Sequence, residues 1–183
     1  MSGPIILPWR GVSPTIASDA FIAPGAVIIG DVVIGSGVTV WFNCVLRGDV
    51  NHIRVGARTN IQDGTVVHVS YKTHPTIIGE DVLIGHMATI HGCTLESKSF
   101  IGMRATVMDG VVVEGEGMVA AGALVSPNKR IPQRQMWAGA PARFVRDVKP
   151  EELKSFSDAV DRYVNLGAEY RALLADKAEG ASI

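Results

Sequence analysis

The sequence predicts an all-β fold, a parallel β-solenoid that is followed by one α-helix. An aliphatic residue recurs at every sixth position over long stretches, and a small or β-branched residue follows most of these four positions later. Neither the 3.6-residue period of a helix nor the alternation of a strand produces a sixfold repeat. A solenoid does, because each hexad supplies a short strand and a corner and three hexads close one coil. The 20 glycines suit such corners, where a positive φ is needed. The repeated aliphatic positions are Ile16, Ile22, Ile28, Ile34, Val40, Leu46, Val55, Ile61, Val67, Ile78, Ile84, Ile90, Ile101, Val107, Val113, Val119 and Val125.

Residues 1–147 are expected to form the solenoid and its N-terminal lead-in. The lead-in is interrupted by Pro4 and Pro8 and lacks a charged segment followed by a long apolar core, so we do not expect a signal peptide. The breaks in the repeat around 52–54 and 72–77 are interpreted as loops at corners. With these loops set aside, hexads that are three steps apart lie on the same face of the prism.

Residues 148–183 are expected to form an amphipathic helix and a tail. Pro150 suits a first helical position, and Glu151 and Glu152 suit the first turn. Apolar residues then recur at helical spacing to about residue 177, so the helix should pack along the solenoid. These residues are Leu153, Phe156, Val160, Val164 and Leu174. The basic segment 129–146 before it is expected to pair with acids of the helix, with coenzyme A phosphates as the alternative partner.

The composition argues against nucleic acid and membranes as partners. A formal net charge of -1 does not provide the basic surface that nucleic acid binding needs. The longest uncharged run, residues 32–46, is too short to cross a bilayer, so we expect a cytoplasmic protein without membrane segments. The two cysteines, Cys44 and Cys93, lie too far apart in sequence for a metal-binding knuckle, and Cys44 fits a core position.

The hexads resemble the left-handed parallel β-helix of the hexapeptide-repeat superfamily over about residues 12–145, and the left hand is taken from this resemblance. Acyltransferases and thioesterases also use such repeats, so the repeat alone does not indicate function. The sequence also contains RGD at 47–49, NIQD at 60–63, His68, and His86 and His91 five positions apart. Together these motifs resemble the gamma-class carbonic anhydrases.

Counting hexads places the candidate metal ligands on two faces. Arg47, His68 and His91 each follow an inward aliphatic residue and stack in one outward column, whereas His86 belongs to the preceding face with Gln62 one coil below it. A convex prism cannot bring two of its own faces to one outward point. We therefore expect a homotrimer in which His68 and His91 come from one chain and His86 from the next, as the resemblance also implies.

Three neutral imidazoles with one open position are typical of a catalytic zinc site. Zinc is therefore the expected metal, with Fe²⁺ or Co²⁺ as substitutes. Zinc lowers the pKa of bound water to about 7, and the resulting hydroxide can attack carbon dioxide to give bicarbonate. The resemblance implies that Gln62 and Asn60 orient the hydroxide and the product. Arg47 and Asp49 are spaced for an ion pair, which we expect to cross the subunit interface.

Two alternatives to carbonic anhydrase activity remain open. One is a zinc-containing thioesterase or acyltransferase that acts on an acyl-CoA, and the other is a structural trimer with little turnover. The archetype of the family has a carboxylate after its RGD and an acidic loop after the first histidine ligand. Val50 and the loop 69–76, which contains no acid, replace these features here. Proton transfer is therefore expected to be slow or to use another group, such as His74 or Tyr71.

Overall fold

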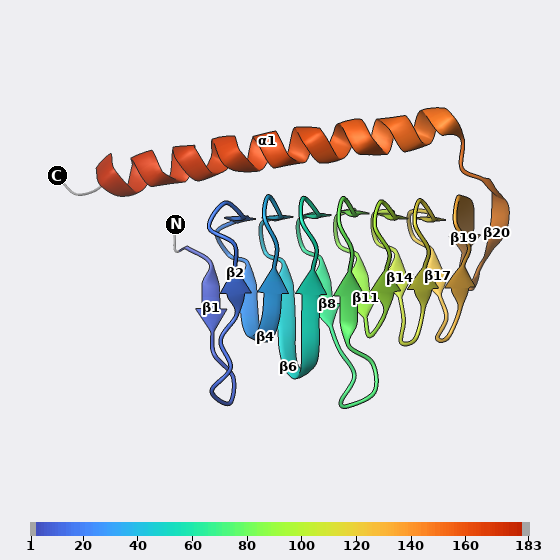
Figure 1. Ribbon diagram of the computed structural model, residues 1–183, viewed down its shortest axis with the longest axis horizontal. Helices are drawn as coiled ribbons and strands as arrows, with labels where there is room; N and C mark the ends of the chain where they lie inside the picture. Colours follow the sequence, from blue (N-terminus) through green and yellow to red (C-terminus); the bar gives the residue numbers. More distant parts are fainter. Residues whose placement is uncertain (1–2, 181–183) are drawn as a thin grey trace.

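Short parallel strands stack into a three-sided, left-handed β-helix, with one long helix beside it (Figure 1). The structure is a computed structural model and describes residues 3–180. The helix α1 spans Pro150–Gly180. The strands are β1 Ile5–Leu7, β2 Thr15–Ile16, β3 Phe21–Ile22, β4 Val27–Ile34, β5 Thr39–Val40, β6 Val45–Val55, β7 Asn60–Ile61, β8 Val66–His68, β9 Thr76–Ile78, β10 Leu83–Ile84, β11 Thr89–His91, β12 Thr94–Leu95, β13 Phe100–Ile101, β14 Thr106–Val107, β15 Val112–Val113, β16 Met118–Val119, β17 Leu124–Val125, β18 Arg130–Ile131, β19 Gln135–Gly139 and β20 Ala142–Asp147.

Two sheets make the three faces. A 12-stranded sheet covers two of them, because β4 and β6 are long enough to continue around a corner and pair along both. An eight-stranded sheet in the order β20-β19-β16-β13-β10-β7-β5-β3 makes the third face. Only the pairing of β19 with β20 is antiparallel within that sheet, which closes the last coil.

The hexad count predicted the strand register, and the structure confirms it. Leu46 pairs with Val67 and Val67 pairs with Ile90, so the three hexads lie on one face. All three side chains are fully buried, and burying an aliphatic side chain contributes about 1.5–3 kcal/mol. Cys44 lies in the same core as expected, and burial raises the pKa of its thiol to about 12.

One predicted loop is correct only as an insertion in the repeat. Residues 52–54 lie within β6, which runs from Val45 to Val55, but the pairing with β4 shifts register between Gly48 and Ile53. The second half of β6 pairs with β9 through Ile53, Arg54 and Val55, so the backbone stays extended beyond the RGD motif. The second predicted loop is shorter than expected, since β9 already begins at Thr76.

The helix α1 packs along the third face, as the apolar spacing predicted (Figure 1). Leu83 of β10 is buried against Ala159 and Val160. Near the first coils, Trp41 makes edge-to-face contacts with Tyr163 and Tyr170, at ring-centroid distances of 5.7 and 5.4 Å. These contacts fix the helix on one face and leave the other two faces uncovered by it.

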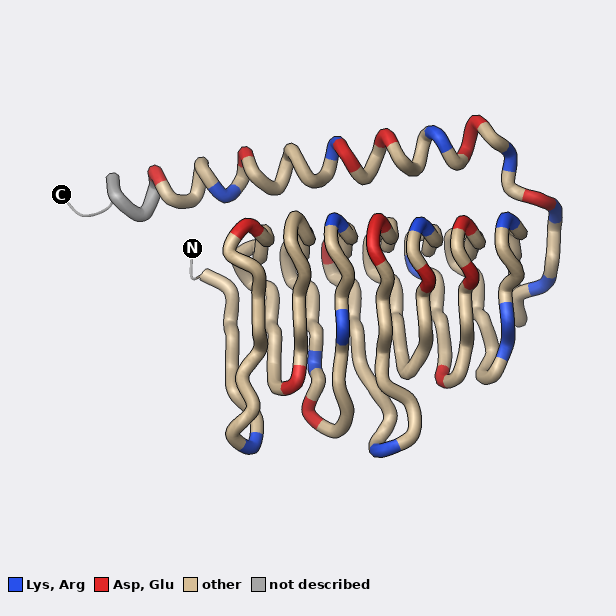
Figure 2. The backbone as a smooth tube through the Cα atoms, viewed as in Figure 1, with Lys and Arg blue, Asp and Glu red and all other residues tan. Residues whose placement is uncertain are grey.

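The basic segment before α1 pairs mainly within the β-helix. Figure 2 shows blue residues along the last coils and the strand that leads to the helix. Arg130 and Arg134 pair with Glu114 and Glu116, which lie one coil earlier. Among the described side chains, Arg146 alone of these arginines reaches an acid of α1, Glu152, so the expected pairing with the helix is correct for one of them. Among the described residues, no helix is long and apolar enough to cross a membrane.

Replacing Glu152 by glutamine is expected to lower the free energy of unfolding by about 1 kcal/mol. The carboxylate accepts two hydrogen bonds from Arg146 and one from the backbone N–H of Lys149, which caps the first turn of α1. The Arg146 guanidinium and this N–H lower the pKa of Glu152 to about 2, from 4.5. The stabilisation is therefore complete above pH 4.5 and is lost as the pH falls toward 2.

Urea titrations of the wild type and Glu152→Gln at several pH values check this prediction. The difference in stability should shrink on acidification. Glu151→Gln is the matched control, and it should behave like the wild type. A Glu152→Gln difference that stays constant from pH 7 to pH 3 would contradict the assignment.

Candidate functional site

His68 and His91 face each other across two neighbouring coils. They pair in register at the ends of β8 and β11, where each follows an inward aliphatic residue and therefore points outward. The Nδ1 atom of His68 lies 3.1 Å from the Nε2 atom of His91. The predicted column of histidines is thus present, and the two rings converge on one point.

The other nitrogen of each ring contacts a carboxylate. His68 Nε2 lies 3.1 Å from Asp49 Oδ1, and His91 Nδ1 lies 2.5 Å from Asp109 Oδ1. An ionised carboxylate only accepts hydrogen bonds, so the ring nitrogen that faces it carries the proton. In the neutral rings, the lone pairs of His68 Nδ1 and His91 Nε2 therefore point toward each other. Two such acceptors lie 3.1 Å apart only with a positive centre between them, which is a shared proton or a metal ion.

His86 lies on a different edge of the prism. It follows β10 at the corner that leads into the face of β11, and the chain turns at Met87, whose φ is +58°. The extended backbone from Ala88 to His91 is about 10 Å long, and it separates the corner at His86 from His91. Among the described residues, no three histidine, cysteine, aspartate or glutamate side chains are grouped closely enough to hold a metal. One chain thus brings His68 and His91 together and leaves His86 apart.

His86 nevertheless has the same local arrangement as the other two histidines. Its Nδ1 atom lies 2.9 Å from Asp63 Oδ2, so its Nε2 atom is left for another partner. Asp63 belongs to the coil below, because Ile61 pairs with Ile84. Gln62 lies one coil below His86, as predicted, and its own register partner is Gly85.

Asp109 is a residue of this cluster that the sequence analysis missed. It accepts a hydrogen bond from Ser70 Oγ at 2.5 Å and from His91, and it lies one coil above His91. Gly92 makes the approach possible, because its φ is +55° and a Cβ atom there would collide with the Asp109 carboxylate. Counting one coil forward from His91 leads to Met108 and Asp109, so the sequence could have indicated Asp109 as a neighbour. The repeat does not show where the side chain of a corner residue points.

Asp49 is shared between His68 and Arg47. Arg47 Nη1 lies 2.6 Å from Asp49 Oδ2 within the single chain, and pairing of these residues across a subunit interface stays a prediction. Both residues lie on β6 two positions apart, which places them on the same side of the strand. Burial opposes ionisation of Asp49, but the hydrogen bonds from Arg47 and His68 outweigh it and lower its pKa. The pKa of His68 is also lowered, first by burial and then by the Arg47 charge, which favours the neutral imidazole.

The two predicted amide side chains are placed differently. Asn60 is fully buried, and its Nδ2 donates to Thr39 Oγ1 at 2.7 Å. Its register partner Leu83 packs against α1, so Asn60 lies beneath the helix and has no surface that could contact a substrate. The expectation that Asn60 contacts the product is therefore wrong. Gln62 is mostly buried but keeps some exposed surface on the coil below His86.

The donor set fits a metal ion. A tetrahedral zinc ion binds histidine nitrogens at about 2.0–2.1 Å, which places two such nitrogens about 3.3 Å apart. The 3.1 Å between His68 and His91 is close to that separation. Metal-binding histidines usually donate their second ring N–H to a carboxylate or a carbonyl, as all three candidate histidines can do here.

Sequence and structure comparisons identify the family of the chain. The family model described as bacterial transferase hexapeptide (six repeats) matches residues 13–48. The chain is 54% identical over 165 residues to gamma carbonic anhydrase 1, mitochondrial, of Arabidopsis thaliana, which covers 87% of this chain. It is 48% identical over 151 residues to a probable carbonic anhydrase of Methanocaldococcus jannaschii, covering 82% of this chain and 94% of that one. The chain belongs to the gamma-class carbonic anhydrase family.

Membership in this family does not by itself fix the activity. The chain spans 60% of the length of the Arabidopsis thaliana relative. A solved structure of a putative acetyltransferase from Bacillus cereus is 36% identical, with a TM-score of 0.92, and the match covers 94% of this chain and 99% of that one. The same fold thus occurs under two functional descriptions, and the histidines and their carboxylates must distinguish between them.

Proposed function

We propose that this protein is a zinc-dependent carbonic anhydrase that hydrates carbon dioxide to bicarbonate at the interfaces of a homotrimer. One observation carries the proposal. Nδ1 of His68 and Nε2 of His91 lie 3.1 Å apart, and a carboxylate contacts the other nitrogen of each ring. His86, with Asp63 on its Nδ1, would supply the third nitrogen from a neighbouring chain.

A closed ring of three chains would bring these groups together. Each interface would join the His68 and His91 edge of one subunit to the His86 corner of the next. Met87 and Met103, which lie beside His86, are 55% and 54% exposed in the single chain. Large apolar side chains that share an exposed patch mark an interaction site. Burial of this patch against a neighbour would also shield the metal site from bulk solvent.

Zinc bound by three neutral histidines lowers the pKa of a water molecule to about 7, which supplies hydroxide near neutral pH. The residues of this chain would hold and orient the groups around it. Asp49, Asp63 and Asp109 would keep the proton on the outer nitrogen of each ring. Gln62 would offer its side-chain amide to the substrate and product, because it lies beside the His86 corner and retains exposed surface.

The ion pairs of the basic segment 129–146 give little support to the alternative function, binding of an acyl-CoA. Three arginines of the basic segment, Arg130, Arg134 and Arg146, each contact a glutamate. Binding coenzyme A phosphates there would require breaking these pairs. The similarity to a putative acetyltransferase therefore supports the shared fold more than a shared acyl donor. A cytoplasmic location remains a prediction, since the Arabidopsis thaliana relative is named as mitochondrial.

The function is tested by measuring CO₂ hydration and acyl-CoA hydrolysis on one zinc-loaded preparation, with Gln62→Ala as the variant. We expect hydration without acyl-CoA hydrolysis. Gln62→Ala should lower hydration about 10–100 fold at unchanged zinc content, the range typical of residues around a metal site. Gln133→Ala, which removes an exposed side-chain amide between β18 and β19, is the control and should keep its rate. Acyl-CoA hydrolysis without CO₂ hydration would overturn the proposal.

A further inference from the structure

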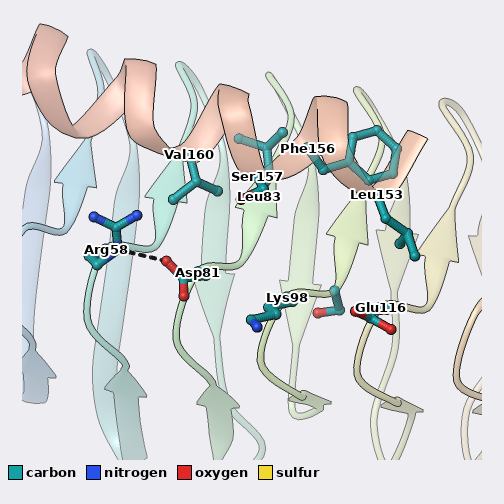
Figure 3. Close-up of a pocket in the computed structure, with 10 residues that line it drawn as sticks. Arg58, Asp81, Leu83, Lys98, Glu116, Leu153, Phe156, Ser157 and Val160 are labelled. Atoms are coloured by element: carbon teal, nitrogen blue, oxygen red, sulfur yellow. Dashed lines mark hydrogen bonds and ion pairs between the residues drawn. The ribbon is translucent and has the colours of Figure 1, made fainter. Parts of the chain in front are cut away.

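A cavity of about 340 Å³ lies between α1 and the third face, remote in the fold from the histidine column. Leu153, Phe156 and Val160 of the helix line one side, and Leu83 of β10 joins them (Figure 3). Phe156 is held by a stacked contact with Phe100, at a ring-centroid distance of 4.3 Å. The volume falls at the lower end of the range for small-molecule sites, about 300–1,000 Å³.

The opposite side of the cavity is charged. Figure 3 shows Arg58, Asp81, Lys98 and Glu116 across from the helix residues. Arg58 binds Asp81 at 2.8 Å and Asp161 at 2.6 Å, so its charge is already matched.

Glu116 is likewise engaged, because Arg134 lies 2.5 Å from it. Lys98 differs from these residues. Within the described part of the chain, no carboxylate lies within 4.0 Å of its ammonium group. The lining therefore offers an available cation, while its acids are paired with arginines.

Ser99 adds a second unused polar group beside Lys98. It lines the same cavity, only 1% of its surface is exposed, and its hydroxyl has no hydrogen-bond partner among the described residues. Leaving a buried hydroxyl unpaired costs about 1–3 kcal/mol. A ligand that accepts a hydrogen bond from this hydroxyl would remove that cost.

From these features we infer that the cavity binds a small carboxylate with an apolar tail. The carboxylate would accept hydrogen bonds from Lys98 and Ser99, and the tail would lie against Leu83, Phe156 and Val160. Such a ligand would contact both α1 and the β-helix. Its binding would therefore strengthen the attachment of the helix.

Titration calorimetry with hexanoate tests this inference on the full chain, with 1-hexanol and hexylamine as probes of the same length. Hexanoate is expected to bind at least fivefold more tightly than either, because only it places a negative charge beside Lys98. Ser99→Ala should weaken hexanoate binding about fivefold. Lys98→Gln should weaken it about three- to fivefold, since the lysine is exposed.

Two further variants control for effects on the fold. Ser157→Leu places a larger side chain into the cavity lining and should abolish binding, whereas Ser155→Leu, on the same helix but outside the lining, should bind like the wild type. Circular dichroism confirms that each variant is folded. The inference is overturned if 1-hexanol binds as tightly as hexanoate or if Lys98→Gln leaves hexanoate binding unchanged. It is also overturned if hexanoate does not bind at a concentration on the order of 10 mM.

Discussion

Replacing any one of His68, His86 and His91 by alanine is expected to remove the metal from the purified protein while the β-helix stays folded. The three side chains point away from the core, so their loss creates no internal cavity. Loss of a direct ligand should reduce metal affinity by more than the roughly 10–100 fold that is typical of outer-shell residues. CO₂ hydration should be lost together with the metal.

Metal content measured by mass spectrometry, with circular dichroism as the test of folding, checks this prediction. His52→Ala and His74→Ala are the matched controls, because neither histidine joins the column of His68 and His91, and both variants should keep a full metal complement. If an alanine variant binds the metal as tightly as the wild type, the histidine that it lacks is not a ligand.

Replacing Asp109 by asparagine is expected to weaken metal binding about 10–100 fold without removing it. The substitution keeps the shape of the side chain but removes the negative charge that His91 Nδ1 contacts. Asp158→Asn, which changes an exposed aspartate of α1, is the control. A competition titration with a zinc chelator measures both variants. Equal zinc affinity in Asp109→Asn and the wild type would show that this carboxylate does not tune His91.

The pH dependence follows from the same contacts. Burial of Asp109 opposes its ionisation, but the hydrogen bonds from Ser70 and His91 outweigh this and lower its pKa below 3.8. Because the folded-state pKa is lowered, the stabilisation by Asp109 is present above pH 3.8 and is lost as the pH falls through the folded-state value. The contribution of Asp109 should therefore be the same at pH 7 and at pH 5.

The sequence predicted the column of His68 and His91 because the hexad repeat fixes which residues lie one coil apart. It also predicted that His86 lies apart from them. The sequence analysis missed Asp63 and Asp109, because the repeat shows on which coil a corner residue lies but not where its side chain points.

Other errors came from the backbone and from packing. Residues 52–54 belong to β6, which the broken repeat had concealed. Asn60 lies beneath α1, because that helix covers the third face. Which face a helix covers, and the cavity that it encloses, depend on side-chain packing between elements distant in sequence. The hexad period carries no such information.

The most direct test of the divided metal site mixes two variants that each lack one ligand. Trimers made only of His86→Ala chains, or only of His68→Ala chains, should have no complete site. Random reassembly of an equal mixture gives about three quarters mixed trimers, and each mixed ring contains one interface with an intact set of ligands. About a quarter of all sites should therefore regain zinc. Mixed trimers, verified by native mass spectrometry, that regain no zinc would contradict a site shared between subunits.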